Sequence, residues 1–150
     1  MHYDPIKRSL GNVFNKSPFM RKLFYNLLDL LLLRSWHVHK ELKAWAKNKT
    51  GDINIFDAGA GFGQYSYWMI RRFKNCNILA VDVKDEQVAD CNRFFSAIGA
   101  TNVKFEIADL TKFVKKNSYN LILSVDVMEH ILEDLQVFNK HEFVDSLFKQ

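Results

Sequence analysis

The chain has 150 residues, a length typical of one folded domain with a single hydrophobic core. Hydrophobic residues make up 48% and charged residues 25% of it, which excludes disordered and fibrous classes. Two cysteines, Cys76 and Cys91, fit no metal-site or disulfide spacing. This excludes a disulfide-stabilised scaffold and favours reduced thiols in a cytoplasmic protein.

The formal net charge of +4 is unevenly distributed along the chain. Residues 1–50 carry ten Lys or Arg against three acids, whereas residues 51–150 carry eleven against fourteen. A basic N-terminal third favours an anionic partner, either lipid headgroups or nucleic acid, although a solvated helix face would have the same composition. The apolar stretch 24–33 contains two polar residues and is too short to span a bilayer, so we expect at most peripheral membrane contact through it.

The N-terminal third has a helical pattern. Ser17 followed by Pro18 is a helix start, with a capping hydroxyl before a proline at the first helical position. The pattern continues to about Lys47, and we expect a break into two helices near residues 34–36. Two neighbouring lines of side chains form a wide apolar face on the first helix: Phe19, Leu23, Leu27 and Leu30, then Met20, Phe24, Leu28 and Leu31.

The remainder of the chain alternates between strand and helix patterns. We expect strands near 53–57, 77–82, 103–107 and 119–125, and helices near 63–74, 85–98, 127–137 and 141–149. Asp85 could cap the second of these helices and Gly99 could end it. Continuous apolar strands separated by helices predict an α/β domain with a parallel sheet covered on both faces.

Residues 53–63 read Ile-Asn-Ile-Phe-Asp-Ala-Gly-Ala-Gly-Phe-Gly. A short apolar run ends in Asp57, and three glycines follow at alternate positions before an amphipathic stretch begins at Gln64. This pattern predicts a buried strand, a tight turn whose glycines let the backbone approach a ligand, and a helix whose N-terminus faces that ligand. The unit is typical of a nucleotide-type cofactor site.

Acids follow three successive predicted strands, at Asp57, Asp82 and Asp109. In an open parallel sheet, ligands bind beyond the carboxyl ends of the strands. Asp82 could accept hydrogen bonds from ribose hydroxyls, and Asp109 could accept one from the exocyclic amine of adenine. Each acid alone could instead cap a helix. Three such acids together with the glycine loop favour a cofactor site.

The glycine spacing separates the candidate cofactors. A dinucleotide fingerprint requires Gly-x-Gly-x-x-Gly, but here the third glycine comes one residue early and Gln64 takes its place. The Gly-Lys-Ser/Thr sequence of a phosphate loop is also absent. Acids around the loop suit a ligand that carries an amine rather than a pyrophosphate.

Four motifs in order carry a resemblance to a known family: Asp-Ala-Gly-Ala-Gly-Phe-Gly at 57–63, the strand ending in Asp82, the Ala108-Asp109 pair, and the segment from Ser124 to Ile131. Over about residues 50–135 the chain resembles the class I S-adenosylmethionine-dependent methyltransferases. The resemblance implies a Rossmann-like parallel sheet with strand order 3-2-1-4 in residues 51–150. It also implies that residues 1–50 form a helical lid or substrate-side extension.

The resemblance further implies a set of cofactor-binding residues: Asp57, Gly59, Gly61, Gly63, Asp82, Val83, Ala108, Asp109 and Ser124. In this family the first acid and the glycines would hold the methionine part of S-adenosylmethionine. The acid that ends the second strand would bind the ribose hydroxyls, with the following valine against the adenine face. The acid after the third strand would accept from the adenine amino group beside the backbone of the preceding alanine.

Residues 125–131, Val-Asp-Val-Met-Glu-His-Ile, bear on the methyl acceptor. They resemble the segment after strand four in methyltransferases of the ubiquinone-biosynthesis type, which implies a small, lipid- or quinone-like acceptor. On a helix, Asp126, Glu129 and His130 would share one face. That face could hold a divalent metal, offer His130 as a general base, or only make structural hydrogen bonds. We take His130 and Glu129 as the candidate catalytic residues and assign no metal.

The resembled family has seven strands, whereas this chain supplies four, lacks counterparts of strands five to seven, and is expected to be part of a longer enzyme. The expected function is methyl transfer to a small molecule. One alternative is an RNA methyltransferase that uses the basic N-terminal region, although we rank nucleic acid below a small molecule as partner. Another is a non-catalytic S-adenosylmethionine-binding domain. A dimer is compatible with the exposed edge of the fourth strand.

Overall fold

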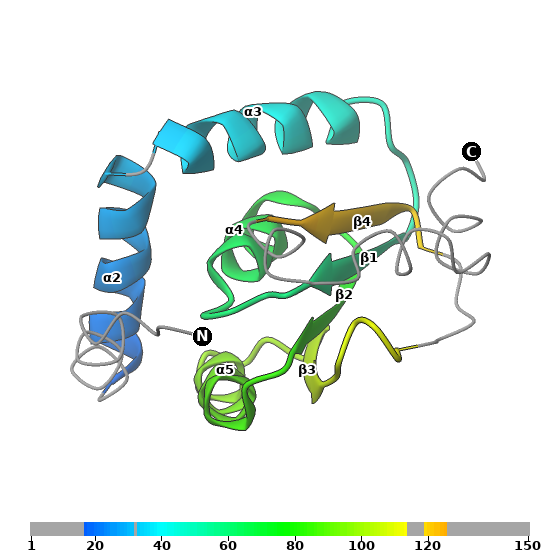
Figure 1. The fold of residues 1–150 in the computed structure, drawn as a ribbon. Helices are drawn as coiled ribbons and strands as arrows, with labels where there is room; N and C mark the ends of the chain where they lie inside the picture. Colours follow the sequence, from blue (N-terminus) through cyan, green and yellow to red (C-terminus); the bar gives the residue numbers. More distant parts are fainter. Residues whose placement is uncertain (1–16, 32, 114–118, 126–150) are drawn as a thin grey trace. The chain divides into compact units, whose positions relative to one another are not determined.

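The computed structural model describes residues 17–31, 33–113 and 119–125 (Figure 1). The chain divides into two compact units between Lys49 and Thr50. The first unit is helical and the second is built on a sheet. Within the described ranges, no helix combines the length and the hydrophobicity needed to cross a membrane.

The first unit contains helix α2 (Pro18–Leu31) and helix α3 (Leu33–Ala46). The hydroxyl of Ser17 accepts a hydrogen bond from the backbone N–H of Met20 at 3.2 Å, which confirms the predicted N-cap. The break comes earlier than the expected residues 34–36, because α2 already ends at Leu31. At this end of the helix, the indole N–H of Trp36 donates to the carbonyl of Asp29 at 2.5 Å.

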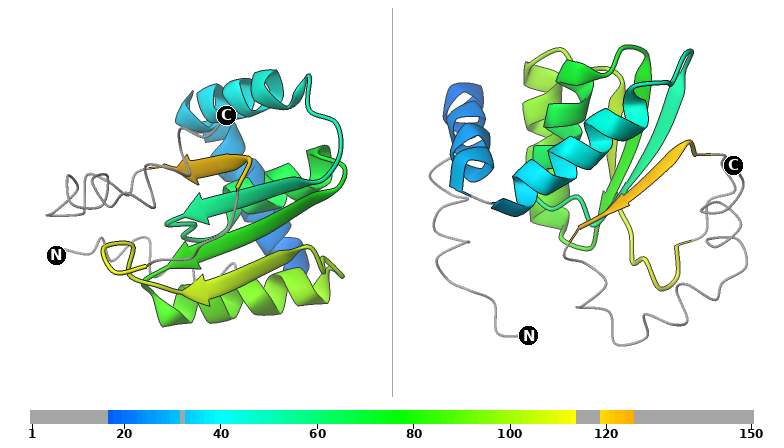
Figure 2. Two further views of the ribbon diagram at one scale, coloured as in Figure 1. Left: turned by 90° about the vertical axis from the view of Figure 1, so that its right-hand side faces the viewer. Right: turned by 90° about the horizontal axis from the view of Figure 1, so that it is seen from above.

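The second unit holds a sheet of four parallel strands, β1 (Ile53–Ala58), β2 (Cys76–Asp82), β3 (Val103–Ile107) and β4 (Leu121–Ser124). Their spatial order is β3-β2-β1-β4, which confirms the predicted Rossmann-like arrangement (Figure 2). In the register, Ala58 pairs with both Val81 and Ser124, and Asp82 pairs with Ile107. The carboxyl ends of all four strands therefore meet at one edge of the sheet.

Helices α4 (Gln64–Arg72) and α5 (Asp85–Ala97) lie on the same face of the sheet (Figures 1 and 2). Two successive right-handed crossovers in the same direction, from β1 to β2 and from β2 to β3, require this placement. Strand residues Ile55 and Ala80 and helix residues Met69 and Phe95 are almost completely buried. This face supplies the ring of Phe105 against which the glycine loop packs.

The opposite face of the sheet carries a second apolar cluster. Phe56, Ala58, Val81 and Leu110 are its buried members. The ring of Phe113 stacks on that of Phe56 with centroids 5.4 Å apart, so the segment after β3 folds back over this face. Both faces of the sheet are thus covered, as the continuous apolar strands predicted.

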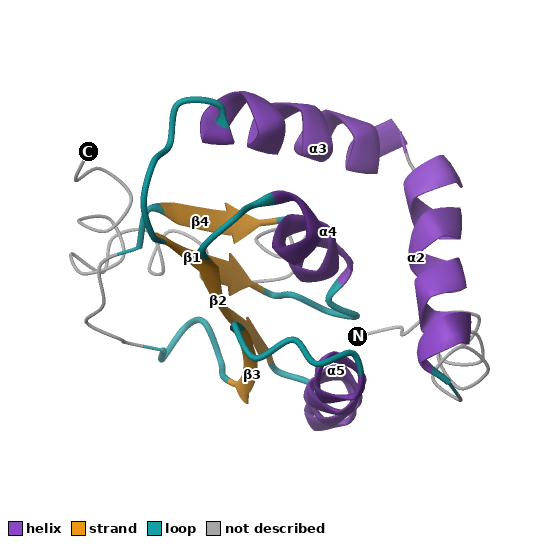
Figure 3. Ribbon diagram, turned by 180° about the vertical axis from the view of Figure 1, so that it is seen from behind, coloured by secondary structure: helices purple, strands orange, loops and turns teal. Residues whose placement is uncertain are grey.

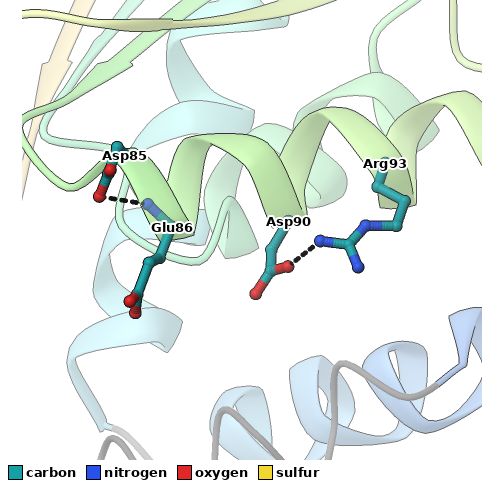
Figure 4. Close-up of polar contacts among 4 residues, drawn as sticks. All are labelled: Asp85, Glu86, Asp90 and Arg93. Carbon is teal, nitrogen blue, oxygen red and sulfur yellow. Dashed lines mark hydrogen bonds and ion pairs between the residues drawn. The ribbon is translucent and has the colours of Figure 1, made fainter.

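The ends of α5 test two expectations from the sequence. Gly99 has a φ of +73°, and its N–H donates to the carbonyl of Ser96 at 3.0 Å, so it ends the helix as expected. The expectation that Asp85 caps the helix is wrong, because Lys84 occupies the N-cap position and Asp85 is the first helical residue. Its carboxylate instead accepts from the N–H of Glu86 at 2.8 Å (Figure 4). An acid there still interacts favourably with the helix dipole.

Helix α5 also covers the outer edge of β3. The side-chain amide of Asn92 donates to the carbonyl of Phe105 at 3.0 Å and accepts from the N–H of the same residue at 3.2 Å. Pairing both backbone groups blocks strand addition at this edge and fixes the position of Phe105. The helices expected at 127–137 and 141–149 lie outside the described residues.

Candidate functional site

The candidate site lies at the edge of the sheet where the strands end. Figure 3 draws in teal the loops that follow β1 and β2 at this edge. The register brings Asp57, Asp82 and the residues that follow β3 to the same edge. Three of the acids singled out in the sequence therefore belong to one region of the structure.

The glycine loop is fastened to the end of β2. The N–H groups of Gly59 and Ala60 both donate to the carbonyl of Val81 at 2.9 Å. The N–H of Gly61 donates to the carboxylate of Asp82 at 2.9 Å. Beneath the loop, the buried thiol of Cys91 lies 3.5 Å from the carbonyl of Gly61. These contacts hold the loop in one position before any ligand binds.

Gly61 and Gly63, the second and third glycines of the loop, lack a side chain for different structural reasons. Both have positive φ, +52° at Gly61 and +74° at Gly63, a conformation that side chains disfavour. A Cβ added to Gly63 would lie 2.9 Å from the ring of Phe105 and 3.1 Å from that of Phe95. A Cβ added to Gly61 would meet no atom within 4 Å. Gly63 therefore permits close packing of the loop on the core, whereas Gly61 faces space that a ligand can occupy.

Asp57 is a buried carboxylate at the end of β1. The hydroxyl of Ser66, which is completely buried, donates to it at 2.6 Å. Burial raises the pKa of Asp57 from 3.8 to about 6, with a smaller contribution from the charge of Asp82, while the hydrogen bond from Ser66 acts in the opposite direction. Ser66 was not among the residues predicted from the sequence, because the spacing does not specify that the first turn of α4 faces back toward Asp57.

Both carboxylate oxygens of Asp82 accept a hydrogen bond from a backbone N–H of the loops after β1 and β2. One accepts from the N–H of Gly61 at 2.9 Å and the other accepts from the N–H of Lys84 at 3.0 Å. Each carboxylate oxygen can accept a second hydrogen bond, so the group can also bind a pair of ligand hydroxyls. The next residue, Val83, is exposed, as is Ile107 at the end of the neighbouring strand. Ile107 was not among the predicted residues, and its position just before Ala108 is the only sequence signal for it.

The segment after β3 is organised by Asp109. Its carboxylate accepts from the N–H of Thr111 at 2.9 Å and from the hydroxyl of the same residue at 2.7 Å. The N–H of Ala108 donates to the carbonyl of Asp82 at 3.0 Å, so this N–H is engaged in extending the strand pairing. Ser124 ends β4 beside Ala58 and is exposed. Ala108, Asp109 and Ser124 therefore lie at the same edge as the loop.

The predicted catalytic residues Glu129 and His130 lie outside the described residues, as does Asp126. Across residues 17–31, 33–113 and 119–125, no three His, Cys, Asp or Glu side chains are grouped so that they could hold a metal ion. The described part of the site thus comprises a glycine loop, three acids and two exposed apolar side chains. This set can bind a ligand that combines hydroxyls, a flat apolar group and a positive charge.

Comparison with known proteins agrees with this geometry. The family described as "Methyltransferase domain" matches residues 55–142, more than half of the chain. The (S)-tetrahydroprotoberberine N-methyltransferase of Eschscholzia californica is 29% identical over 86 residues, which cover 57% of this chain. The aligned part makes up 24% of that relative's length, so the chain corresponds to only a portion of such enzymes.

Solved structures show the same fold. A protein assigned as a sarcosine dimethylglycine methyltransferase from Galdieria sulphuraria superposes with a TM-score of 0.61 and 24% identity, over 69% of this chain and 38% of that one. Coclaurine N-methyltransferase, solved with N-methylheliamine and SAH, superposes with a TM-score of 0.52 and 21% identity, over 59% of this chain and 26% of that one. SAH is the demethylated form of S-adenosylmethionine, the cofactor of these enzymes. The chain accordingly belongs to the methyltransferase-domain family of class I S-adenosylmethionine-dependent methyltransferases.

Proposed function

We propose that this chain binds S-adenosylmethionine at the carboxyl edge of its sheet and takes part in methyl transfer to a small molecule. The observation that carries the proposal is the open space at Gly61, next to an amide that is hydrogen-bonded to Asp82. A loop fixed in this way presents backbone and carboxylate to a ligand without first having to be ordered.

The described residues fit the parts of the cofactor one by one. Asp82 retains acceptor capacity for the two ribose hydroxyls. Val83 and Ile107 are exposed apolar side chains that could pack against the flat faces of the adenine ring. Asp109 would accept from the adenine amino group, as the family resemblance implies. Ser124, at the end of β4, remains a candidate contact on the other side of the glycine loop.

Asp57 would act on the methionine part through its charge. Its carboxylate is buried behind the loop, so it favours a cation in front of the loop by electrostatic attraction. An ammonium group nearby would in turn lower the pKa of Asp57, which burial raises to about 6 in the protein alone. Cofactor binding and deprotonation of Asp57 are therefore coupled.

The bound cofactor supplies a methyl group that its sulfonium has already activated. The protein has to align the acceptor with that methyl group and exclude water. We propose that His130 removes a proton from an acceptor that is protonated at neutral pH, with Glu129 beside it. A neutral amine would need no such base.

The acceptor class is proposed from the names of the relatives and from the sequence. Two of the similar proteins are named as N-methyltransferases, one of (S)-tetrahydroprotoberberine and one of coclaurine, which favours a small amine as the acceptor. The lipid- or quinone-like acceptor implied by residues 125–131 is the second member of the same small-molecule class. One turnover assay can test both acceptor classes, the small amine and the lipid- or quinone-like molecule.

The test is a turnover assay on the complete chain with a panel of small amines, an amphipathic lipid amine, a quinol and RNA, with release of S-adenosylhomocysteine as the readout. We expect release with at least one small molecule and its loss in Asp82→Ala. Methylation of RNA alone would replace the small-molecule proposal. Tight cofactor binding with no turnover on any acceptor would identify a non-catalytic binding domain.

A further inference from the structure

Helix α2 exposes a line of large apolar side chains that has no role in the proposed cofactor site. Phe19, Leu23, Leu27 and Leu30 are 72%, 49%, 41% and 70% exposed. Their spacing of four, four and three residues places them on one face of the helix, and we call them the apolar stripe. Phe24, on another face, is buried. The helix is therefore apolar on two faces, one buried and one in contact with solvent.

Exposed apolar side chains continue into the start of α3. Leu33 and Trp36 are both more than half exposed. The indole N–H of Trp36 is held by the carbonyl of Asp29, so the apolar part of the ring stays at the surface. A contiguous exposed apolar patch on a protein marks a surface that another molecule covers. Tryptophan with an apolar ring and a satisfied N–H is typical of membrane–water interfaces.

The charges of the helical unit that carries the stripe indicate what covers it. In the described part of the first unit, the exposed charged side chains are six basic residues and one acid: Lys22, Arg34, Lys40, Lys43, Lys47, Lys49 and Glu41. Lys22 follows Phe19 by three residues, so the two are neighbours on the surface of α2. A second copy of this unit would bring like charges together, which disfavours self-association. An anionic surface would instead be attracted.

We propose that the apolar stripe of α2 docks this protein on an anionic lipid surface. The helix has 14 residues and is about 21 Å long, shorter than the apolar core of a bilayer, so it lies in the plane of the interface. The stripe enters the boundary between headgroups and acyl chains, and the basic side chains contact the anionic headgroups. Docking of this kind would give the proposed methyl transfer access to amphipathic acceptors, but it does not depend on that activity.

The first test measures binding of the complete chain to vesicles of phosphatidylcholine with and without phosphatidylglycerol, by co-sedimentation. We expect binding to the anionic vesicles that weakens as salt is added. The double substitution Leu23→Gln with Leu27→Gln should reduce binding at least about tenfold, because it removes two apolar groups from the interface. The matched variant Leu23→Met with Leu27→Met should bind as the wild type does. Equal binding by the glutamine variant, or no binding by the wild type, would overturn the proposal.

A second readout separates docking from effects on folding. Both native cysteines are buried, so a polarity-sensitive dye can be attached selectively to Leu27→Cys, with Ala89→Cys at an exposed position of α5 as the control. Anionic vesicles should shift the emission to the blue at the first position and leave it unchanged at the second. No shift at either position would contradict docking through the stripe, and so would concentration-dependent dimerisation that covers the stripe without lipid.

The cofactor site provides an independent check on the same glutamine variant. We expect it to bind S-adenosylhomocysteine as the wild type does, because the stripe lies outside the glycine-loop unit. Lost vesicle binding with retained cofactor binding would support the docking surface. Failure of cofactor binding in both proteins would refute the proposed function and leave the vesicle result unaffected.

Discussion

Replacing Asp57 by Asn should change how the stability of the protein depends on pH. Asn has nearly the shape of Asp and keeps an oxygen that can accept the hydrogen bond from Ser66, which donates to Asp57 at 2.6 Å. It removes the negative charge from a buried site. The substitution therefore isolates the contribution of that charge from the packing around it.

The magnitude follows from the pKa of Asp57, which is raised from 3.8 to about 6 in the folded protein. A group whose pKa is raised on folding stabilises the protein fully below the unfolded value, and this contribution is lost as pH rises through the folded value. The difference between 3.8 and about 6 corresponds to about 3 kcal/mol. Ionised Asp57 thus makes the folded wild type less stable at neutral pH by this amount, and the Asn variant lacks the effect.

The assay is urea unfolding of wild type and Asp57→Asn from about pH 4 to about pH 8. The free energy of unfolding of the variant, relative to that of the wild type, should rise by about 2.4 kcal/mol across this range, because part of the roughly 3 kcal/mol is already lost at about pH 4, just above the unfolded pKa of 3.8. Any constant cost of the unpaired side-chain amide cancels in that difference. Cofactor affinity should fall in the same variant, because the charge behind the loop is gone. A difference that stays constant with pH would refute the assignment of Asp57 as a buried carboxylate whose charge is poorly solvated.

Three further substitutions probe the same loop. Ser66→Ala removes the donor to Asp57 and should destabilise the protein by about 1.5–3 kcal/mol at neutral pH but less below pH 4, as measured by urea unfolding. Gly63→Ala should lower the free energy of unfolding by roughly 2–5 kcal/mol. The positive φ would be strained for alanine, and its Cβ would also lie too close to the rings of Phe105 and Phe95. Gly61→Ala should cost only about 1–2 kcal/mol and mainly weaken cofactor binding, so equal stability losses at the two glycines would contradict their separate roles. Asp82→Ala should raise the Kd for S-adenosylhomocysteine about a hundredfold in calorimetry, and an unchanged Kd would exclude it as the ribose acceptor.

The sheet and the edge at which its strands end could be predicted because they depend on local and strongly patterned features. Continuous apolar runs mark buried parallel strands, and the acid or glycine that follows each run marks the strand end. In a parallel sheet all these ends meet at one edge, so Asp57, Asp82 and Asp109 could be placed together without coordinates. The strand order and the register confirm that these strand ends meet at one edge.

The details inside the site could not be predicted in this way. Ser66 reaches Asp57 only because α4 turns back across the face that carries the acid, and spacing in the sequence does not specify that direction. The three glycines look equivalent in the sequence, and only the rings of Phe95 and Phe105 distinguish Gly63. A motif indicates which backbone positions need glycine, but not which atom each one makes room for.

In the helical unit, too, the sequence predicts only part of what the structure shows. Hydrophobic periodicity gives the width of an apolar face but does not show which part of it is buried. In α2 the line that begins at Phe19 is exposed, whereas Phe24 is buried. The pattern predicts a break between the two helices but not its position after Leu31, because the apolar spacing continues past that residue.

Calorimetric titration of the complete chain with S-adenosylhomocysteine tests the central claim most directly. The glycine loop, the acid that ends β2 and the open space at Gly61 predict binding at a single site. That binding should be lost or strongly weakened in Asp82→Ala while cooperative unfolding is retained. Absence of binding to a wild-type protein that unfolds cooperatively would contradict the assignment of this edge as the cofactor site.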